Sequence, residues 1–179
     1  MVPCLAGRGW HLKRHAHQAS ISAVTPSDLW AVIVMAQELS LHEGNPPAEL
    51  TVDGLSEVML GPHPLLFGRI ARIEEGIVGY AIWTLGYTMQ YGRPLLEVTD
   101  LYVRPGFRRR GIARALMRGM ADVALERGCR FMTVKTFADN LEANAFYPAC
   151  GGQIDRTNVY DFGQRAMAAL MVEMNGTRT

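Results

Sequence analysis

The sequence predicts a mixed α/β fold in which a β-sheet carries helices on both of its faces. Three observations favour this class. Residues 25–60 show helical periodicity, residues 65–86 have the pattern of two strands joined by a tight turn, and residues 94–136 alternate strand, helix and strand. Early helices can cover one face of a hairpin-built sheet, and a strand–helix–strand unit places a further helix against the sheet.

The first elements are a short strand and a long amphipathic helix. Residues 21–24 form the strand, and Thr25 then caps a helix that has Pro26 at its first position and Asp28 in its first turn. The helix ends near Gly44, where an Asn-Pro-Pro break follows. Its apolar stripe, which we expect in the core, consists of Leu29, Val32, Ile33, Ala36 and Leu39.

A shorter helix and three strands come next. The helix covers about residues 53–60 and ends at a Gly-Pro break. The following apolar segments are rich in β-formers, and a Glu-Gly pair between the first two is typical of a hairpin turn. The strands are expected over residues 65–74, 77–86 and 94–103.

The remaining elements alternate between helix and strand. A helix over residues 110–127 ends at Gly128, a typical helix-ending residue. A strand over 131–136 and a helix over 140–150 follow, and the helix is stopped by a Gly-Gly pair. We expect a final strand over residues 159–162 and a last helix over residues 164–174.

Composition bounds the class of protein. The chain has 179 residues and a formal net charge of +1, so it is long enough for one well-packed domain and is not a broadly basic nucleic-acid binder. No repeat or linker divides it, which predicts one domain over residues 19–179. Residues 1–18 have no apolar signal core and are interpreted as a disordered or extraneous extension. Their histidines, His11, His15 and His17, are interpreted as part of a solvated tail rather than as metal ligands.

Cysteines are few and widely spaced. Cys4, Cys129 and Cys150 form no CxxC pair, so neither a disulfide framework nor a structural metal site is expected. A reducing, cytoplasmic setting is the simplest interpretation. No apolar run approaches roughly 18 residues, so no membrane span is expected.

One turn stands out chemically. Three consecutive arginines, Arg108, Arg109 and Arg110, precede Gly111 between a predicted strand and a predicted helix. Free N–H groups at a helix start bind phosphate, and glycine allows close backbone approach. The turn lacks the lysine and hydroxyl residue of a P-loop and the glycines of a dinucleotide fingerprint. On these residues alone, a nucleic-acid patch, a solvated loop and a phosphate cradle all stay open.

Two motifs resemble one family. The segment RRRGIA, residues 108–113, matches the Q/R-x-x-G-x-G/A acetyl-CoA signature of the GNAT acetyltransferase superfamily, and DLYVRP before it resembles that family's fourth strand. The segment NLEANAFYPACGG, residues 140–152, fits the family's N-x-x-A-x-x-F-Y-x-x-x-G pattern. The resemblance covers about residues 20–163 and implies a mostly antiparallel sheet. ELSLHEG and IVGYA are also similar to the spermidine/spermine (diamine) acetyltransferase branch.

The resemblance implies a site for acetyl-CoA as co-substrate, with no metal. The backbone of the fourth strand would pair with the pantetheine arm, and the turn would hold the pyrophosphate. Asn140 would bond the pantetheine, or act as a plain helix cap. The strand positions are Leu101, Tyr102 and Val103, and the turn positions are Arg108, Arg109, Arg110, Gly111, Ile112, Ala113 and Arg114.

The resemblance also implies direct attack of a primary amine on the thioester in a ternary complex. Tyr147 stands at the family's general-acid position, and a phenol can protonate a departing thiolate. Glu97 is the leading candidate for the base, directly or through water, because it stands four residues before Leu101, where some members of the superfamily keep a glutamate base; a water chain from other groups is the alternative. Strand alternation is expected to put residues 97, 99, 101 and 103 on one face. Thr99 departs from an acidic residue of the diamine branch. Asp100 is expected to point to the other face.

The acceptor pocket is expected from the first helix, the loop that follows it and the C-terminal strand over residues 159–162. Glu38, His42 and Glu43 offer acidic or titratable groups to a cationic amine, although ordinary solvated helix charges are the preferred interpretation of these residues. The alternative function is a non-catalytic acyl-CoA-binding or sensing domain. A nucleic-acid module conflicts with the near-neutral charge and with the second motif. A homodimer is expected from the habit of the family.

Overall fold

The computed structural model describes residues 19–175. The chain forms two compact units, with the boundary between Thr136 and Phe137, and each unit is described separately. The N-terminal histidines and Cys4 lie outside the described residues. One domain over residues 19–179 therefore stays a prediction. No helix among the described residues combines the length and apolarity needed to cross a bilayer.

The first unit is built on a five-stranded sheet of order β1-β2-β3-β4-β5. All neighbouring strands pair antiparallel except β4 and β5, which are parallel. The mixed, mostly antiparallel α/β class is thereby confirmed. The strands are β1 Ser20–Ala23, β2 Phe67–Ile73, β3 Gly76–Thr88, β4 Arg93–Val103 and β5 Met132–Val134.

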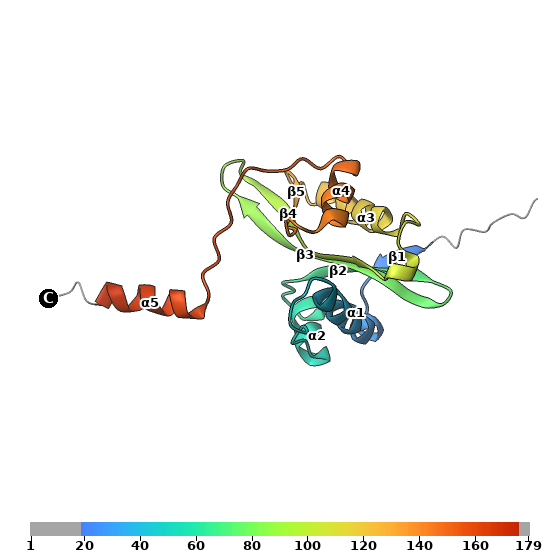
Figure 1. Ribbon diagram of the computed structural model, residues 1–179, viewed down its shortest axis with the longest axis horizontal. Helices are drawn as coiled ribbons and strands as arrows, with labels where there is room; N and C mark the ends of the chain where they lie inside the picture. The colour runs from blue at the N-terminus through green and yellow to red at the C-terminus, as the bar shows by residue number, and fades with distance from the viewer. Residues whose placement is uncertain (1–18, 176–179) are drawn as a thin grey trace, which may run out of the picture. The chain divides into compact units, whose positions relative to one another are not determined.

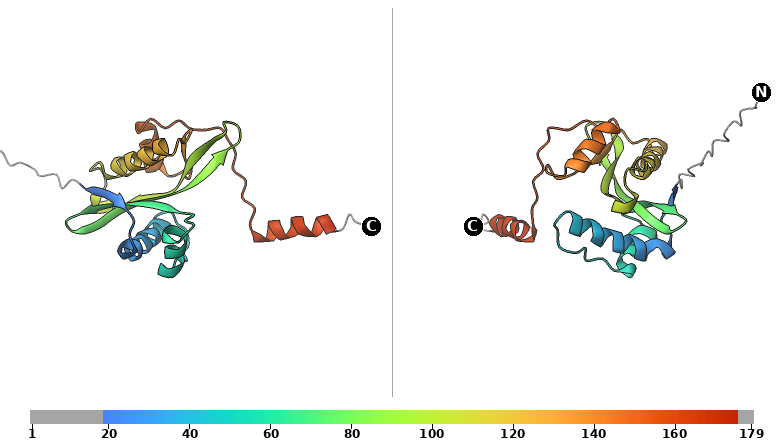
Figure 2. Two further views of the ribbon diagram at one scale, coloured as in Figure 1. Left: turned by 180° about the vertical axis from the view of Figure 1, so that it is seen from behind. Right: turned by 45° about the vertical axis from the view of Figure 1, so that its right-hand side comes forward.

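Helices cover both faces of this sheet, as Figures 1 and 2 show. A short 3-10 turn, η1 (Pro26–Asp28), leads into α1 (Leu29–His42), and α2 (Val52–Leu60) packs beside α1. On the opposite face α3 (Ile112–Glu126) follows the 3-10 turn η2 (Pro105–Phe107). Each face has its own apolar core. The α1/α2 face buries Leu29, Val32, Ile33, Met35, Ile70, Tyr80, Ile82 and Tyr102, and the α3 face buries Ala71, Val78, Trp83, Leu96, Val98, Val103, Leu116 and Met120.

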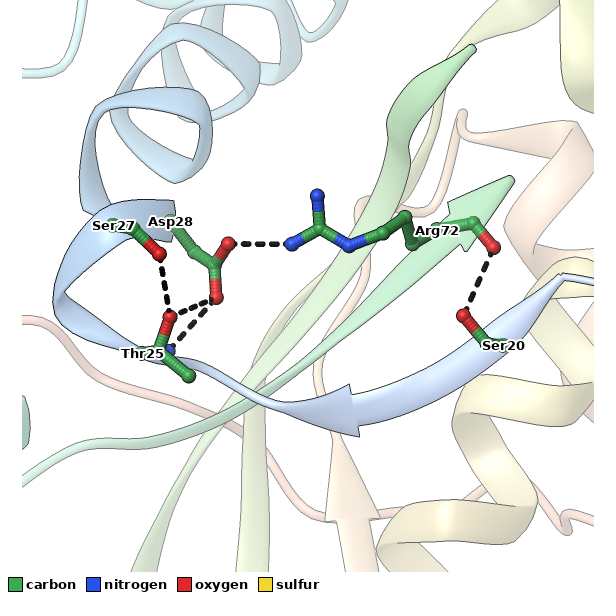
Figure 3. A network of polar contacts seen from close by, with 5 residues as sticks. All are labelled: Ser20, Thr25, Ser27, Asp28 and Arg72. Carbon is green, nitrogen blue, oxygen red and sulfur yellow. Dashed lines mark hydrogen bonds and ion pairs between the residues drawn. The ribbon is translucent and has the colours of Figure 1, made fainter. Parts of the chain in front are cut away.

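A buried carboxylate fixes the start of α1 against the sheet (Figure 3). Asp28 is 3% exposed, and its Oδ2 accepts hydrogen bonds from the Thr25 backbone N–H at 2.9 Å and from the Thr25 hydroxyl at 2.6 Å. Its Oδ1 accepts from Arg72 Nη2, also at 2.6 Å. Burial alone would raise the pKa of Asp28, but the hydrogen bonds from Thr25 and Arg72 outweigh burial and hold the pKa below its ordinary value.

We expect Asp28→Asn to lower the free energy of unfolding by about 1–3 kcal/mol, because it removes a charge-assisted bond from a buried position. A carboxyl with a lowered folded-state pKa stabilises the fold above its unfolded pKa and loses that contribution as pH falls through the folded value. Urea titrations from pH 7 to pH 3 test both points. The difference between the two proteins should be largest at pH 7 and shrink toward pH 3; an equal difference at both would contradict the account.

The second unit holds α4 (Leu141–Ala149) and α5 (Gln164–Asn175). The expected strand over residues 159–162 is wrong, since residues 152–163 adopt no regular structure. A strand needs a hydrogen-bonded neighbour, and the described sheet ends at β5 with β4 as its partner. Several apolar side chains of this unit are exposed, among them Ile154, Val159, Tyr160 and Phe162.

Candidate functional site

The second half of β4 has an open edge. The pairing of β4 with β5 covers only Leu96, Glu97 and Val98, so residues 99–103 extend past the last described partner on that side. The Arg104 N–H donates to the Val78 carbonyl at 2.9 Å, across the pair formed by Gly79 and Val103. By antiparallel alternation, the N–H and C=O groups of Val103 and Leu101 point away from β3 and toward the open edge, where the Val103 carbonyl already accepts a hydrogen bond from Arg108. Such an edge accepts an extended chain as an added strand.

This edge leads through η2 into the start of α3. Gly111 caps α3 with φ 82°, and Arg109 also has a positive φ of 61°. The first hydrogen bond of the helix runs from the Ala115 N–H to the Gly111 carbonyl at 3.0 Å. The N–H groups of Gly111, Ile112 and Ala113 therefore have no partner within the helix, and the helix dipole adds partial positive charge there. Backbone donors in this arrangement suit a diphosphate.

The three arginines have different surroundings. Arg108 Nε donates to the Val103 carbonyl at 2.9 Å, and the guanidinium lies over the Tyr102 ring. Arg110 Nη2 donates to the Gly106 carbonyl at 3.0 Å, and its guanidinium lies over the Phe107 ring. Arg109 is exposed and has no polar side-chain partner within residues 19–175. Two arginines thus brace the turn, and Arg109 is available to an anion.

A β-bulge at Thr99 changes which side chains face which side. Ile82 pairs with Asp100 and Trp83 pairs with Val98, so Thr99 is an extra residue on β4. The expected common face for residues 97, 99, 101 and 103 is therefore wrong. Beyond the bulge, Leu101 and Val103 pack on the α3 side. Asp100 shares the α1/α2 face with its partner Ile82, on the same side as Tyr102.

Asp100 therefore belongs to a polar group that the sequence did not indicate. Burial raises the pKa of the Asp100 carboxyl, although the nearby hydroxyls of Thr99 and Tyr80 act the other way. Glu43 follows the last residue of α1 and is largely exposed; its partial burial raises the pKa of its carboxyl, and the charge of Asp100 raises it further, against smaller opposing effects of His42 and Asn45. A carboxylate whose charge opposes the ionisation of another creates a local environment that favours a cation.

Among the residues expected to bind the acceptor amine, Glu38 already forms an ion pair. Arg104 Nε and Nη2 donate to the Glu38 carboxylate at 3.1 and 2.9 Å, and Arg104 Nη1 donates to the Ile77 carbonyl. Burial raises the pKa of the Tyr102 phenol, and Glu38 adds to this effect. This ion pair ties α1 to β4. His42 is exposed in the last turn of α1, next to Glu43.

Glu97 lies before the bulge and pairs with a lysine. Its Oε1 is 2.9 Å from Lys135 Nζ, and its side chain is 38% exposed. Its register partners are Thr84 on β3 and Thr133 on β5. Thr99 is exposed, and its hydroxyl donates to the Ile82 carbonyl at 3.2 Å. Glu97 must exchange Lys135 for an amine or a water before it can take a proton.

The second unit carries the remaining predicted residues. Asn140 caps α4, where its Oδ1 accepts a hydrogen bond from the Ala143 N–H at 3.0 Å. Tyr147 is half-buried on α4, and its ring meets Phe146 edge-on at 5.4 Å. The cap role of Asn140 is thus directly visible. Within residues 19–175, no three His, Cys, Asp or Glu side chains are grouped to hold a metal ion.

Comparisons with known proteins agree with this fold. A model of the acetyltransferase (GNAT) family matches residues 34–151. Thialysine N-epsilon-acetyltransferase from Bos taurus is 32% identical over 77 residues, which cover 43% of this chain and 45% of that protein. The protein of the same name from Caenorhabditis elegans is 32% identical over 109 residues, or 60% of this chain and 66% of that protein. The chain thus covers less than two thirds of either relative.

Solved structures share the fold at lower identity. An integron cassette protein from V. cholerae superposes with a TM-score of 0.71 at 20% identity, covering 86% of this chain and 98% of that one. An aminoglycoside acetyltransferase from a soil metagenomic sample, in complex with sisomicin, gives a TM-score of 0.68 at 17% identity and covers 82% and 95%. The family match includes the β4 edge, the turn before α3 and α4. The chain therefore belongs to the acetyltransferase (GNAT) family.

Proposed function

We propose that the protein transfers the acetyl group of acetyl-CoA to a primary amine by direct attack in a ternary complex. The observation that carries the proposal is the continuity of two backbone features. The open edge of β4 at Leu101 and Val103 leads within a few residues to the unpaired N–H groups at Gly111–Ala113. An extended arm that ends in a diphosphate matches this sequence of donors and acceptors.

In this proposal the backbone binds coenzyme A and the arginines assist. The edge formed by Leu101, Tyr102 and Val103 pairs with the pantetheine arm. The N–H groups of residues 108–114 surround the pyrophosphate. Arg109 adds charge from the side, while Arg108 and Arg110 keep the turn in shape through their bonds to backbone carbonyls. Asn140 contributes to the pantetheine site from the cap of α4.

The acceptor amine enters from the α1/α2 face in this proposal. The charge of Asp100 opposes the ionisation of Glu43, and the ammonium group of the acceptor would relieve that repulsion. Glu38 contributes through its ion pair with Arg104, which fixes the end of α1 beside β4. His42 and Thr99 stand at the rim of this group. The related proteins named thialysine N-epsilon-acetyltransferase make a side-chain amine the first acceptor to test.

Bound acetyl-CoA supplies the thioester that is attacked. The deprotonated amine nitrogen forms a bond to the carbonyl carbon, and the carbon–sulfur bond breaks. Glu97 takes the proton that the ammonium loses, directly or through water, once its ion pair with Lys135 has opened. Tyr147 gives its phenolic proton to the thiolate, which leaves as the thiol, and the second proton of the acetylated nitrogen returns through water to the Tyr147 phenolate. Cytoplasmic location and a homodimer remain predictions, and the exposed apolar side chains of the second unit are compatible with a dimer.

A thiol-release assay tests this function. We expect acetyl-CoA to yield free coenzyme A with thialysine, lysine, polyamines or aminoglycosides as acceptors. Tyr147→Phe should lower kcat by about 100-fold, since general-acid catalysis is typically worth that much. The matched control is Tyr160→Phe, which changes an exposed tyrosine of the same unit and should keep full activity. Tight acetyl-CoA binding without release over the whole panel would instead favour a non-catalytic binding domain.

A further inference from the structure

The hydroxyl of Tyr80 is a buried polar group without a good partner. Tyr80 lies on β3 and is 1% exposed, in the core on the α1/α2 face of the sheet. Its Oη has no hydrogen-bond partner of satisfactory geometry among the described residues. Buried hydroxyls without a bond are rare because their loss of water is uncompensated. Phenylalanine would fill the same volume without that cost, so the hydroxyl calls for an explanation.

The register of the sheet places Asp100 near the Tyr80 hydroxyl. Tyr80 pairs with Tyr102, and Asp100 stands two residues before Tyr102 on β4. Diagonal neighbours on one face lie within reach of a long aromatic side chain. The bulge at Thr99 is what brings Asp100 to this face, since regular alternation from Glu97 would have turned it away. Tyr102 does not compete for the carboxylate, because its phenol interacts with Glu38.

We propose that the Tyr80 hydroxyl is a positioning group for Asp100: it donates a hydrogen bond to the Asp100 carboxylate and so holds this carboxylate in place for the ammonium group of the acceptor. The inference rests on the proposed function for the identity of the acceptor. Tyr80 acts through Asp100 and does not touch the reacting atoms.

Electrostatics on this face agree with that role. Burial, followed by the charges of Asp100 and Glu43, raises the pKa of the Tyr80 phenol far above its ordinary value, so the phenol stays protonated and is a permanent donor. The nearby Tyr80 hydroxyl lowers the pKa of Asp100 and so works against the effect of burial. The charged and titratable groups that face the pair are Glu43 with neighbouring His42 at the end of α1, and Tyr102 on β4. Loss of the Tyr80 hydroxyl should therefore raise the pKa of Asp100.

An NMR titration of the side-chain carboxyl tests this without relying on catalysis. The Asp100 resonance is assigned from its loss in Asp100→Asn. In Tyr80→Phe we expect it to titrate at higher pH than in the wild type. Tyr102→Phe removes a hydroxyl from the same core and the same cross-strand pair, and should leave the Asp100 titration unchanged. An unchanged titration in Tyr80→Phe, or an equal shift in both variants, would overturn the proposal.

Kinetics provide the second readout. In Tyr80→Phe we expect the KM for the acceptor to rise about tenfold, with the acid limb of kcat/KM displaced to higher pH. In an Asp100→Asn background the same substitution should have no further effect, because the partner is gone. An equal loss in both backgrounds would show that Tyr80 acts by packing alone. If the wild type releases no thiol with any amine, the proposed function fails, while the NMR result still decides the role of Tyr80.

Discussion

Gly111→Val is expected to weaken coenzyme A binding by about 10- to 100-fold, which corresponds to the 1–3 kcal/mol that a residue in an unfavourable backbone region costs. Gly111 has φ 82°, and a β-branched residue avoids this region. A Cβ at this position would meet no atom within 4 Å, so the effect is conformational and not steric. A valine here shifts the backbone and redirects the N–H groups of Ile112 and Ala113, which we propose hold the pyrophosphate.

The same turn offers a matched control. Gly106 also has open space around its Cβ position but has no positive φ, so Gly106→Val adds the same side chain without the same strain. Isothermal titration with coenzyme A should rank the variants in the order wild type, Gly106→Val, Arg109→Ala and Gly111→Val, from tightest to weakest. A greater loss in Arg109→Ala than in Gly111→Val would mean that side-chain charge is the main holder of the phosphates.

This ranking depends on a distinction that the sequence could not make. Three consecutive arginines indicated a phosphate site, but the sequence did not distinguish the arginines that face a ligand from those that do not. Arg108 and Arg110 reach back to the carbonyls of Val103 and Gly106, and those bonds depend on the path of η2. The helix start itself was predictable, because a glycine between a strand and an amphipathic segment has few conformational alternatives.

The acceptor side was less predictable for a related reason. The limits of α1, β3 and β4 follow from periodicity and turn residues, and the structure confirms them to within a few residues. A β-bulge adds one residue without any clear signature in the sequence, since Thr99 is an ordinary strand residue. Every side chain on one side of it then changes face relative to those on the other side. The face predicted for Asp100 was wrong on this account, and Tyr80 was not identified as its neighbour, although both residues lie in correctly predicted strands.

The prediction of a strand over residues 159–162 was wrong for the opposite reason. Val159, Tyr160 and Phe162 have high β-propensity, and propensity alone suggested a strand. Propensity in strands mostly reports packing against neighbours, and this segment is exposed in the second unit. Local preference therefore had no partner strand through which to act.

Asp100→Asn should produce the largest loss on the acceptor side, a decrease of about 100-fold in kcat/KM for the amine that appears mainly as a higher KM. Asparagine keeps the shape of the side chain but cannot neutralise an ammonium group. Because burial raises the pKa of Asp100, the carboxylate becomes anionic only as the pH rises through that raised value. Amine binding should therefore weaken at low pH in the wild type, and this acid limb should be lost in Asp100→Asn.

Asp122→Asn is the matched control, since it removes the same charge from an exposed position on α3 and should keep wild-type kinetics. Glu97→Gln distinguishes binding from proton transfer. If Glu97 is the base, this variant lowers kcat and leaves the acceptor KM close to that of the wild type, the reverse of the pattern for Asp100→Asn. If the KM is unchanged in Asp100→Asn, the ammonium group binds away from the bulge. The paired carboxylate of Glu97, 2.9 Å from Lys135, would then be the first alternative to test.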